Sequence, residues 1–352
     1  NLMRRKAMAL LLTVAMAAGL TACGGGSSDP ASSSDVSTGT ASSGKAITIK
    51  LCHTDPSGCA VTTALQQFAE AVTKDTDGRI VIEEYADGIM GDDDEINEQI
   101  YNGAYMMNYS DPALLEPYYP EYSILFSPYF YNSYDEIAKV AQTDFGKRLQ
   151  AECKEAGLMV LDGMSSYYGS RQIMSKKPIN TPDDLKGLNF RMPNNATQLE
   201  LAEAWGANPA TISFSETYKA LQQGVVDCVE NPIGALKANS IDEVCPYINI
   251  TNHFYAVNGL VMNAKIFDSL DADLQQILLD DAADFVEYST KMVADEEEEV
   301  LQQMVEDNGV TVNRDVDVEA MKAAAQKVFE VHGWSQELID EANAALAEVR
   351  GE

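Results

Sequence analysis

Residues 184–232 read DLKGLNFRMPNNATQLELAEAWGANPATISFSETYKALQQGVVDCVENP. The stretch from 187 to 192 predicts a short strand that ends at Pro193, because the residue before a proline favours an extended backbone. Side chains alternate along a strand, so Phe190 lies on one face and Arg191 on the other. The segment therefore predicts a strand that carries an arginine near its end, followed by a helix.

The arginine at the end of this strand has two interpretations. Arg191 either points into a cleft or is an ordinary solvated arginine of a surface strand. The spacing of the residues alone favours neither, so the choice depends on the rest of the chain.

Three separated elements of the segment occur together in one protein family. The order LKGLNFRMP, WGANP and SFSETYKALQQGVVDCVENP resembles the substrate-binding proteins of tripartite ATP-independent periplasmic (TRAP) transporters, and most of all the branch of dicarboxylate and sialic-acid binders. The resemblance extends from about Ala46 to the C-terminus. It implies an α/β, two-lobed, periplasmic-binding-protein-like (type II-like) fold with a hinge and a long helix that spans both lobes.

The resemblance also implies which side chains bind a ligand. Arg191 would grip a carboxylate, and Arg171, in a matching G-S-R-Q element, would be a second cationic contact. Phe214 would pack on the ligand and Asn231 would reach it. Asp111 falls near a position that varies with the ligand and can face the cleft.

Histidine content argues against catalysis. The chain has three histidines, His53, His253 and His332, which are far apart in sequence. It has no H-E-x-x-H, G-x-S-x-G or G-x-x-x-x-G-K-[ST] motif. We therefore expect no enzyme activity and no cofactor. His53 follows the first strand and is a further candidate for the ligand site, because binding loops cluster at strand ends.

The N-terminus predicts export and a lipid anchor. Basic residues at 4–6 precede an apolar run at 7–20, which has 14 residues and is too short for a bilayer core that needs about 20. Residues 1–22 are therefore typical of a signal peptide. The preceding Leu-Thr-Ala makes Cys23 a lipidation site and the mature N-terminus. The alternative is an ordinary cleaved signal with an incidental Cys23.

Composition predicts a membrane tether and excludes one class of partner. Residues 23–44 are rich in Gly and Ser, with too little apolar content to fold, and would hold the body outside the membrane through the lipid at Cys23. The chain has 24 Lys+Arg against 55 Asp+Glu, and loss of residues 1–22 leaves 21 against 55, a net charge near −34. Nucleic acid is therefore not a partner. An anionic ligand would need Arg171 and Arg191.

The rest of the chain, about 308 residues, is long enough for two domains. Residues 47–82 show a strand, an amphipathic helix and a second strand, which is typical of an α/β lobe. Residues 270–309 have helical spacing over about 55 Å, too long for one lobe. We expect lobe I to comprise residues 45–168 and 257–296, and lobe II to comprise residues 169–256 and 297–352.

Two residue clusters allow a functional or a structural interpretation. The acidic run at 91–95 invites a metal site, but carboxylates at a helix N-terminus bind free N–H groups, and calcium-loop spacing is missing. The aromatic run at 112–134 suits a sugar site, yet such runs more often pack a loop onto its lobe. We favour the structural interpretation of both, and expect no metal.

Five cysteines remain after Cys23. The local candidates for disulfides are Cys52 with Cys59 and Cys228 with Cys245, but the sequence does not establish any pairing. No zinc spacing occurs. Cys228 also stands where the family usually has glycine, which affects the expected local geometry.

These observations favour a solute-binding lipoprotein that captures an organic acid by lobe closure and delivers it to TRAP permease subunits in the membrane. Among acids, the polar residues favour a sugar acid such as a hexuronate, with a C4-dicarboxylate close behind. A binding protein that feeds a sensor kinase or an ATP-driven importer is an alternative. An extracellular enzyme is a third, which the missing motifs oppose.

Overall fold

The structure, a computed structural model, describes residues 46–352. The predicted signal peptide (1–22), the predicted lipidation site Cys23 and the predicted tether (23–44) lie outside the described residues. Within the described range, no helix is both long and apolar enough to cross a membrane.

Lobe I, as we define it, is built on three parallel strands. Strand β1 (Ile47–Cys52) pairs with β2 (Ile80–Tyr85) and β3 (Met106–Ser110). Helix α1 (Ala60–Asp75) connects β1 to β2 and buries an apolar face that includes Phe68, which confirms the predicted strand-helix-strand opening. The other elements of lobe I are α2 (Asp93–Tyr101), η1 (Pro112–Leu115), η2 (Pro120–Phe126), α3 (Asp135–Gln142), α4 (Asp144–Glu155), β4 (Leu158–Val160) and α8 (Ala264–Ser269).

Lobe II contains the strand that carries Arg191. Strand β6 (Asn189–Met192) pairs in parallel with β7 (Asn208–Thr211) and β8 (Cys228–Pro232). Phe190 faces the core and stacks on Trp205, as the strand alternation predicts. The other elements of lobe II are β5 (Ser166–Ser175), η3 (Pro182–Leu185), α5 (Ala196–Ala204), α6 (Phe214–Gln223), α7 (Ile233–Ala238), η4 (Ile241–Glu243), β10 (Thr311–Asn313) and α10 (Val318–Val331).

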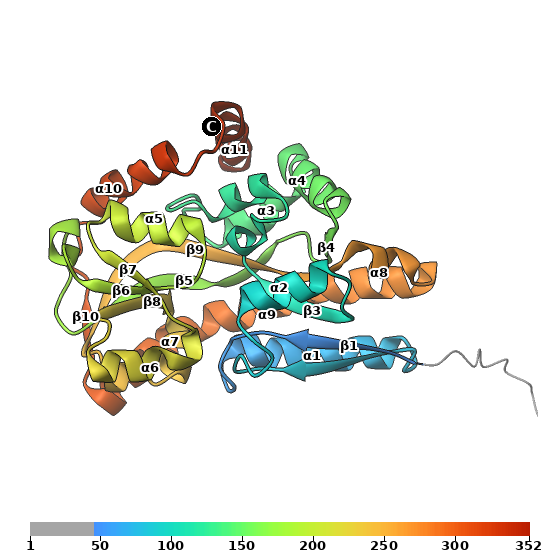
Figure 1. The fold of residues 1–352 in the computed structure, drawn as a ribbon, viewed down its shortest axis with the longest axis horizontal. Coiled ribbons are helices and arrows are strands. Elements are labelled where there is room, and N and C mark those ends of the chain that lie inside the picture. Colours follow the sequence, from blue (N-terminus) through green and yellow to red (C-terminus); the bar gives the residue numbers. More distant parts are fainter. Residues whose placement is uncertain (1–45) are drawn as a thin grey trace, which may run out of the picture. The chain divides into compact units, whose positions relative to one another are not determined.

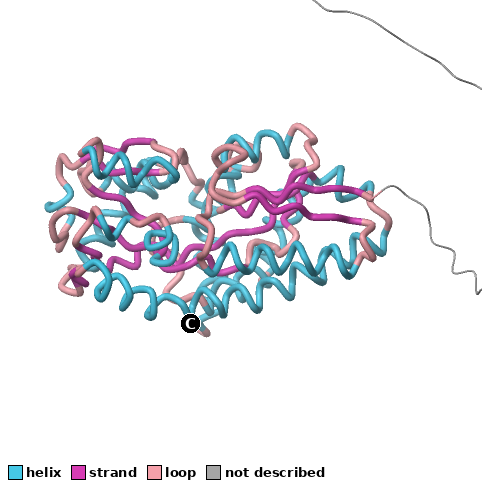
Figure 2. The backbone as a smooth tube through the Cα atoms, turned by 90° about the horizontal axis from the view of Figure 1, so that it is seen from below, coloured by secondary structure: helices cyan, strands magenta, loops and turns pink. Residues whose placement is uncertain are grey.

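Two long elements belong to both lobes (Figures 1 and 2). Strand β9 (Tyr247–Asn263) pairs with β5 of lobe II along one part and with β3 of lobe I along the other, so the strands form one continuous sheet. Helix α9 (Ala272–Asn308) packs against α1 of lobe I and α7 of lobe II. The predicted long helix that spans both lobes is therefore confirmed. The lobe boundaries near residues 168, 256 and 296 stay a prediction.

The last helix corrects one of the assignments made from sequence. Residues 297–352 were expected in lobe II, and α10 does pack on α5 there. Helix α11 (Gln336–Arg350) instead packs on α3 and α4 of lobe I. The physical reason is that Arg350 forms a two-point ion pair with Glu136 of α3, at 2.8 Å for both contacts. The chain thus returns to lobe I at its end.

The clusters with two interpretations have structural roles in the described residues. Glu95 accepts a hydrogen bond from the backbone N–H of Asp92 (3.3 Å) at the start of α2, which is a helix cap. Most aromatic side chains between residues 118 and 134 pack against the core, with Tyr122 and Phe126 almost fully buried. All five cysteines of the described range are buried and free, so neither candidate disulfide forms.

Candidate functional site

Side chains of both lobes line a cavity of about 50 Å³. It brings together five of the six ligand-binding residues predicted from sequence. It adjoins a second cavity of about 170 Å³, and the lining residues common to both are Thr54, Asp93, Leu114, Arg191, Pro193 and Phe214. Lobe I contributes Thr54, Asp93, Asp111 and Leu114, and β5 contributes Tyr168, at the lobe boundary, and Arg171. Lobe II also contributes Arg191, Pro193, Gln198, Phe214 and Asn231, and the shared strand β9 contributes Asn258.

Arg191 lies at the end of β6 and is 4% exposed, which excludes the solvated interpretation. Its Nε donates to the carbonyl oxygen of Ile212 at 2.7 Å, and its guanidinium lies 5.3 Å from the centre of the Phe214 ring. No carboxylate oxygen of residues 46–352 lies within 4.0 Å of it. Burial lowers the pKa of Arg191 to about 10, which still leaves a cation at neutral pH. A buried cation without a paired anion is costly unless a ligand supplies the anion.

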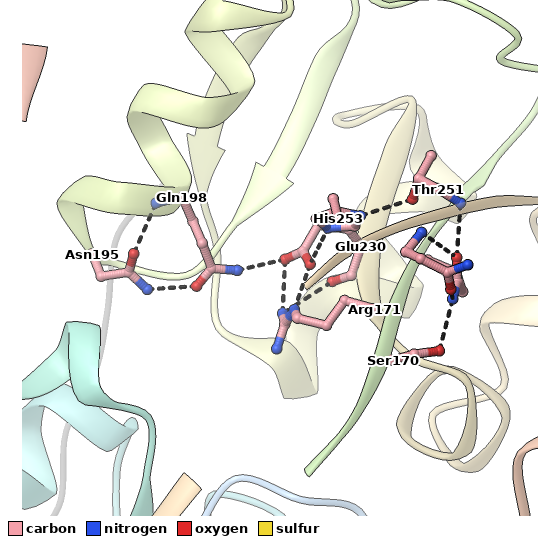
Figure 3. Close-up of polar contacts among 9 residues, drawn as sticks. Ser170, Arg171, Asn195, Gln198, Glu230, Thr251 and His253 are labelled. Carbon is pink, nitrogen blue, oxygen red and sulfur yellow. Dashed lines mark hydrogen bonds and ion pairs between the residues drawn. The ribbon is translucent and has the colours of Figure 1, made fainter. Parts of the chain in front are cut away.

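Arg171 of β5 has a different environment (Figure 3). Its Nε and Nη2 donate to the two carboxylate oxygens of Glu230, at 2.5 and 2.7 Å. Both residues are almost fully buried. Burial alone raises the pKa of Glu230, but Arg171 outweighs it and holds that pKa well below the usual range. The positive charge of Arg171 is thus already balanced within the protein.

A hydrogen-bond network fixes Glu230 from two further sides (Figure 3). Gln198 Nε2 donates to Glu230 at 2.7 Å, and Asn195 orients Gln198 from the start of α5. His253 Nε2 lies 3.1 Å from Glu230 and its Nδ1 lies 2.7 Å from the hydroxyl of Thr251. Burial lowers the pKa of His253, so a neutral ring donates to Glu230 and accepts from Thr251. The network holds the ion pair rigidly against the cavity.

Three buried oxygen atoms of the cavity lining have no hydrogen-bond partner among residues 46–352. They are Oδ1 of Asp93, Oδ1 of Asn231 and Oδ1 of Asn258. Because nearly all buried polar atoms in folded proteins are paired, three such atoms in one cavity indicate a place where a bound molecule completes the hydrogen bonding.

Two carboxyl groups face the same space from lobe I. Burial raises the pKa of Asp93 to about 7 and that of Asp111 to about 6. Asp111 accepts from the backbone N–H of Leu114 (3.0 Å) and so caps η1. Asp93 accepts from the hydroxyl of Thr54 with one oxygen only (2.6 Å). Residues 46–352 hold no cluster of His, Cys, Asp and Glu suited to a metal ion.

Comparison with known families identifies the architecture that carries this cavity. Residues 51–333 match the model of the bacterial extracellular solute-binding protein family 7. The chain belongs to this family. Its members are the substrate-binding proteins of TRAP transporters, so the chain is an extracytoplasmic solute-binding protein and not an enzyme.

Relatives in the TRAP family differ in their ligands. The C4-dicarboxylate-binding periplasmic protein DctP of Rhodobacter capsulatus is 30% identical over 78% of this chain and 81% of its own length. A TRAP solute-binding protein of Ochrobacterium anthropi with bound L-fuconate has a TM-score of 0.81 at 32% identity, over 86% of this chain and all of that one. One of Fusobacterium nucleatum with bound sn-glycerol-3-phosphate has a TM-score of 0.82 at 28% identity, over 87% and 99%.

Within this TRAP protein, the cavity does not include His53. The side chain is fully buried, with Nε2 2.8 Å from Glu84 and Nδ1 3.4 Å from Asp55. The physical reason is that these two carboxylates hold the imidazole in the interior, while the next residue, Thr54, lines the cavity.

Sequence reasoning missed several residues that line the cavity or support it. Asp93 was interpreted only as part of a helix cap, and Asn258, in the middle of β9, was not singled out. Glu230 directly precedes the predicted Asn231 in the buried strand β8 and was not singled out. A buried carboxylate within an apolar strand normally has a cationic partner.

Proposed function

We propose that this TRAP solute-binding protein captures an organic acid in the cavity between its lobes, with Arg191 as the carboxylate anchor. The lobes close around the acid, and the closed form delivers it to TRAP permease subunits. A lipid at Cys23 holds the protein at the extracytoplasmic face of the membrane. A sugar acid such as a hexuronate is the favoured ligand.

The observation that supports this proposal is the unpaired, buried guanidinium of Arg191. A carboxylate forms two parallel, charge-assisted hydrogen bonds with such a fork, which fixes its orientation. Hydrogen bonds to charged groups contribute about 1.5–3 kcal/mol each. Phe214 would cover the apolar face of the ligand, while Asn231 and Asp111 supply polar contacts.

A C4-dicarboxylate is the second candidate ligand, because the R. capsulatus relative is named for that class. Arg171 would then face the second carboxylate, but its charge is already taken by Glu230. Delivery to a sensor kinase or an ATP-driven importer is an alternative for the partner, and a neighbouring pair of permease genes would argue against it.

The anchor is tested by a thermal-shift screen of residues 46–352 against organic acids. A ligand at about a hundred times its dissociation constant adds about 2.7 kcal/mol to the stability of the folded state. We expect the wild type to shift with its acid and Arg191→Ala not to shift. Arg191→Lys should retain only part of the response, because an ammonium lacks the planar fork.

The matched control is Arg79→Ala, which removes an exposed arginine of lobe I that pairs with Asp273. It should keep the full ligand response. A full response of Arg191→Ala would show that the carboxylate anchor lies elsewhere.

A further inference from the structure

The cavity offers one uncompensated positive charge. Arg171 and Arg191 both line it, but Glu230 neutralises Arg171 through two short contacts. Among residues 46–352, the side chain of Arg191 has only the carbonyl oxygen of Ile212 as a hydrogen-bond partner. A ligand with a single carboxylate therefore matches the charge that is available.

The unpaired atoms of the lining have a consistent polarity. The side-chain nitrogen of Asn258 donates to the carbonyl oxygen of Tyr109 at 3.2 Å, so the Oδ1 atom of Asn258 is free to accept a hydrogen bond. Asn258 is only 5% exposed. Asp93 Oδ1 is a carboxyl oxygen. The Asn231 amide makes no hydrogen bond through Oδ1 to the described residues and can present either its oxygen or its nitrogen to a ligand. The unpaired side-chain atoms of the lining other than Arg191 are therefore mainly acceptors, so they require hydrogen-bond donors on the ligand.

The lobe I side of the cavity is acidic. Asp93 and Asp111 line it, and Asp92, Asp94 and Glu95 line the adjoining cavity. A second ligand carboxylate placed there would meet like charges and acceptor oxygens in a desolvated space. Both effects are unfavourable.

We propose that the site selects hydroxylated monocarboxylates over dicarboxylates, and that Asp93 is the residue that makes this selection. The inference rests on the proposed function of the cavity as a carboxylate site and specifies its ligand class. The carboxylate lies on Arg191 of lobe II, and hydroxyl groups at the other end of the ligand donate to Asp93 and Asn258.

The local geometry of Asp93 suits this role. The hydroxyl of Thr54 donates a hydrogen bond to Oδ2 of Asp93 at 2.6 Å, which leaves Oδ1 of Asp93 free to accept a hydrogen bond from a ligand in the cavity. Burial raises the pKa of Asp93 to about 7, so both protonation states occur near neutral pH. A ligand hydroxyl both donates and accepts, so it pairs with either state, whereas a carboxylate pairs only with the protonated one.

The test measures dissociation constants by calorimetry for wild type and Asp93→Asn. The panel contains hexonates and hexuronates, adipate with a second carboxylate, hexanoate without hydroxyls, and succinate. We expect at least one hydroxylated monocarboxylate to bind wild type about a hundredfold more tightly than adipate, hexanoate or succinate. Asp93→Asn replaces an acceptor by a donor and should reduce the preference over adipate at least tenfold.

Glu98→Gln is the matched control, since it removes a carboxylate of the same helix that is exposed and away from the cavity. It should leave every dissociation constant unchanged. The wild-type ranking does not depend on the folding of any variant.

The outcomes separate the inference from the proposed function. If a dicarboxylate or hexanoate binds wild type most tightly, and Arg191→Ala abolishes that binding, the proposed selection of hydroxylated monocarboxylates is wrong. The role of Arg191 as the carboxylate anchor is then still supported. An unchanged preference in Asp93→Asn would overturn the role of Asp93. If no acid binds, or if Arg191→Ala binds as wild type does, both the proposed function and the inference fail.

Discussion

The buried charged side chains of this protein differ in whether an oppositely charged side chain lies next to them. Glu230 is paired with Arg171, whereas Arg191 is buried without an anionic partner in the part of the chain that the structure describes. His53 lies between two carboxylates, Asp55 and Glu84, with no exposed surface. Burial opposes its protonation, but the hydrogen bond to Glu84 and the nearby carboxylate of Asp55 outweigh burial and raise the pKa of His53 to about 9.

A pH-dependent stability follows from His53. Its pKa in the folded state lies above the unfolded value of about 6.5, so its stabilising contribution is complete below that pH and is lost as the pH rises through about 9. His53→Gln should lower the free energy of unfolding by an amount on the order of 3 kcal/mol at pH 6 and by much less at pH 9. Urea denaturation of both proteins at pH 6–9 measures this difference. A difference that stays constant over this range would contradict the assignment.

The sequence predicted the residues of the site unequally. Arg191, Arg171, Phe214 and Asn231 follow from short motifs, and the structure places them in one cavity. Motifs do not reveal that Glu230 neutralises Arg171, because that depends on the register of β5 against β8, which pairs Arg171 with Pro232. The burial of His53 between Asp55 and Glu84 was not predictable for a similar reason, because Glu84 lies 31 positions away on β2.

Among the elements, β5 has an irregularity at the point where it enters lobe II. Its register against β9 shifts between Tyr167 and Gly169. Gly169 has a φ of +135°, and a Cβ at this position would lie 2.6 Å from the Cβ of Pro232. Only glycine allows β5 and β8 to approach so closely at the lobe junction.

Gly169→Ala should therefore destabilise the protein by more than the backbone strain of a positive φ alone, because the new Cβ also collides with Pro232. Gly187→Ala is the control, because Gly187 has a φ of +74° and a Cβ added there would have no neighbouring atom within 4 Å. The control should cost about 1–2 kcal/mol of stability, and Gly169→Ala about 1–3 kcal/mol more, from overpacking against Pro232. Chemical denaturation measures both values. Equal losses would mean that the contact relaxes freely.

Helices with a persistent apolar spacing were predicted correctly from the sequence, but the surfaces against which they pack were not. The long helix of residues 270–309 corresponds to α9 because its apolar spacing persists over many turns. The placement of α11 was wrong because an amphipathic pattern indicates that a helix has a buried face but not which surface covers it. The ion pair of Arg350 with Glu136 joins residues 214 positions apart, which local spacing does not encode.

At the scale of the whole molecule, polar contacts join lobe I to lobe II and to the lobe boundary. Asn194 of lobe II donates to Asp94 of lobe I at 2.8 Å, and the hydroxyl of Tyr168, at the boundary, donates to Asp55 of lobe I at 2.6 Å. The first of these contacts is exposed and lies at the edge of the adjoining cavity. We expect it to stabilise the closed, ligand-bound arrangement.

Asn194→Ala should raise the ligand dissociation rate about 2–10-fold, because an exposed hydrogen bond contributes about 0.5–1.5 kcal/mol. The association rate should change little. Asn102→Ala, which alters an exposed asparagine at the far end of α2, is the control. Stopped-flow fluorescence with the bound acid measures both rates. Identical dissociation rates in the two variants would mean that this contact does not hold the lobes together.

The sharing of β9 and α9 between the lobes has a consequence for how such a protein diversifies. The chain passes between lobes I and II along β9 and α9 and again between α10 and α11, so no single breakpoint separates one complete lobe from the other. A single crossover between the genes of two relatives would place β9 or α9 of one protein against strands and helices of the other. New specificities in this architecture therefore arise more readily by point substitution in the cavity lining than by exchange of lobes between relatives.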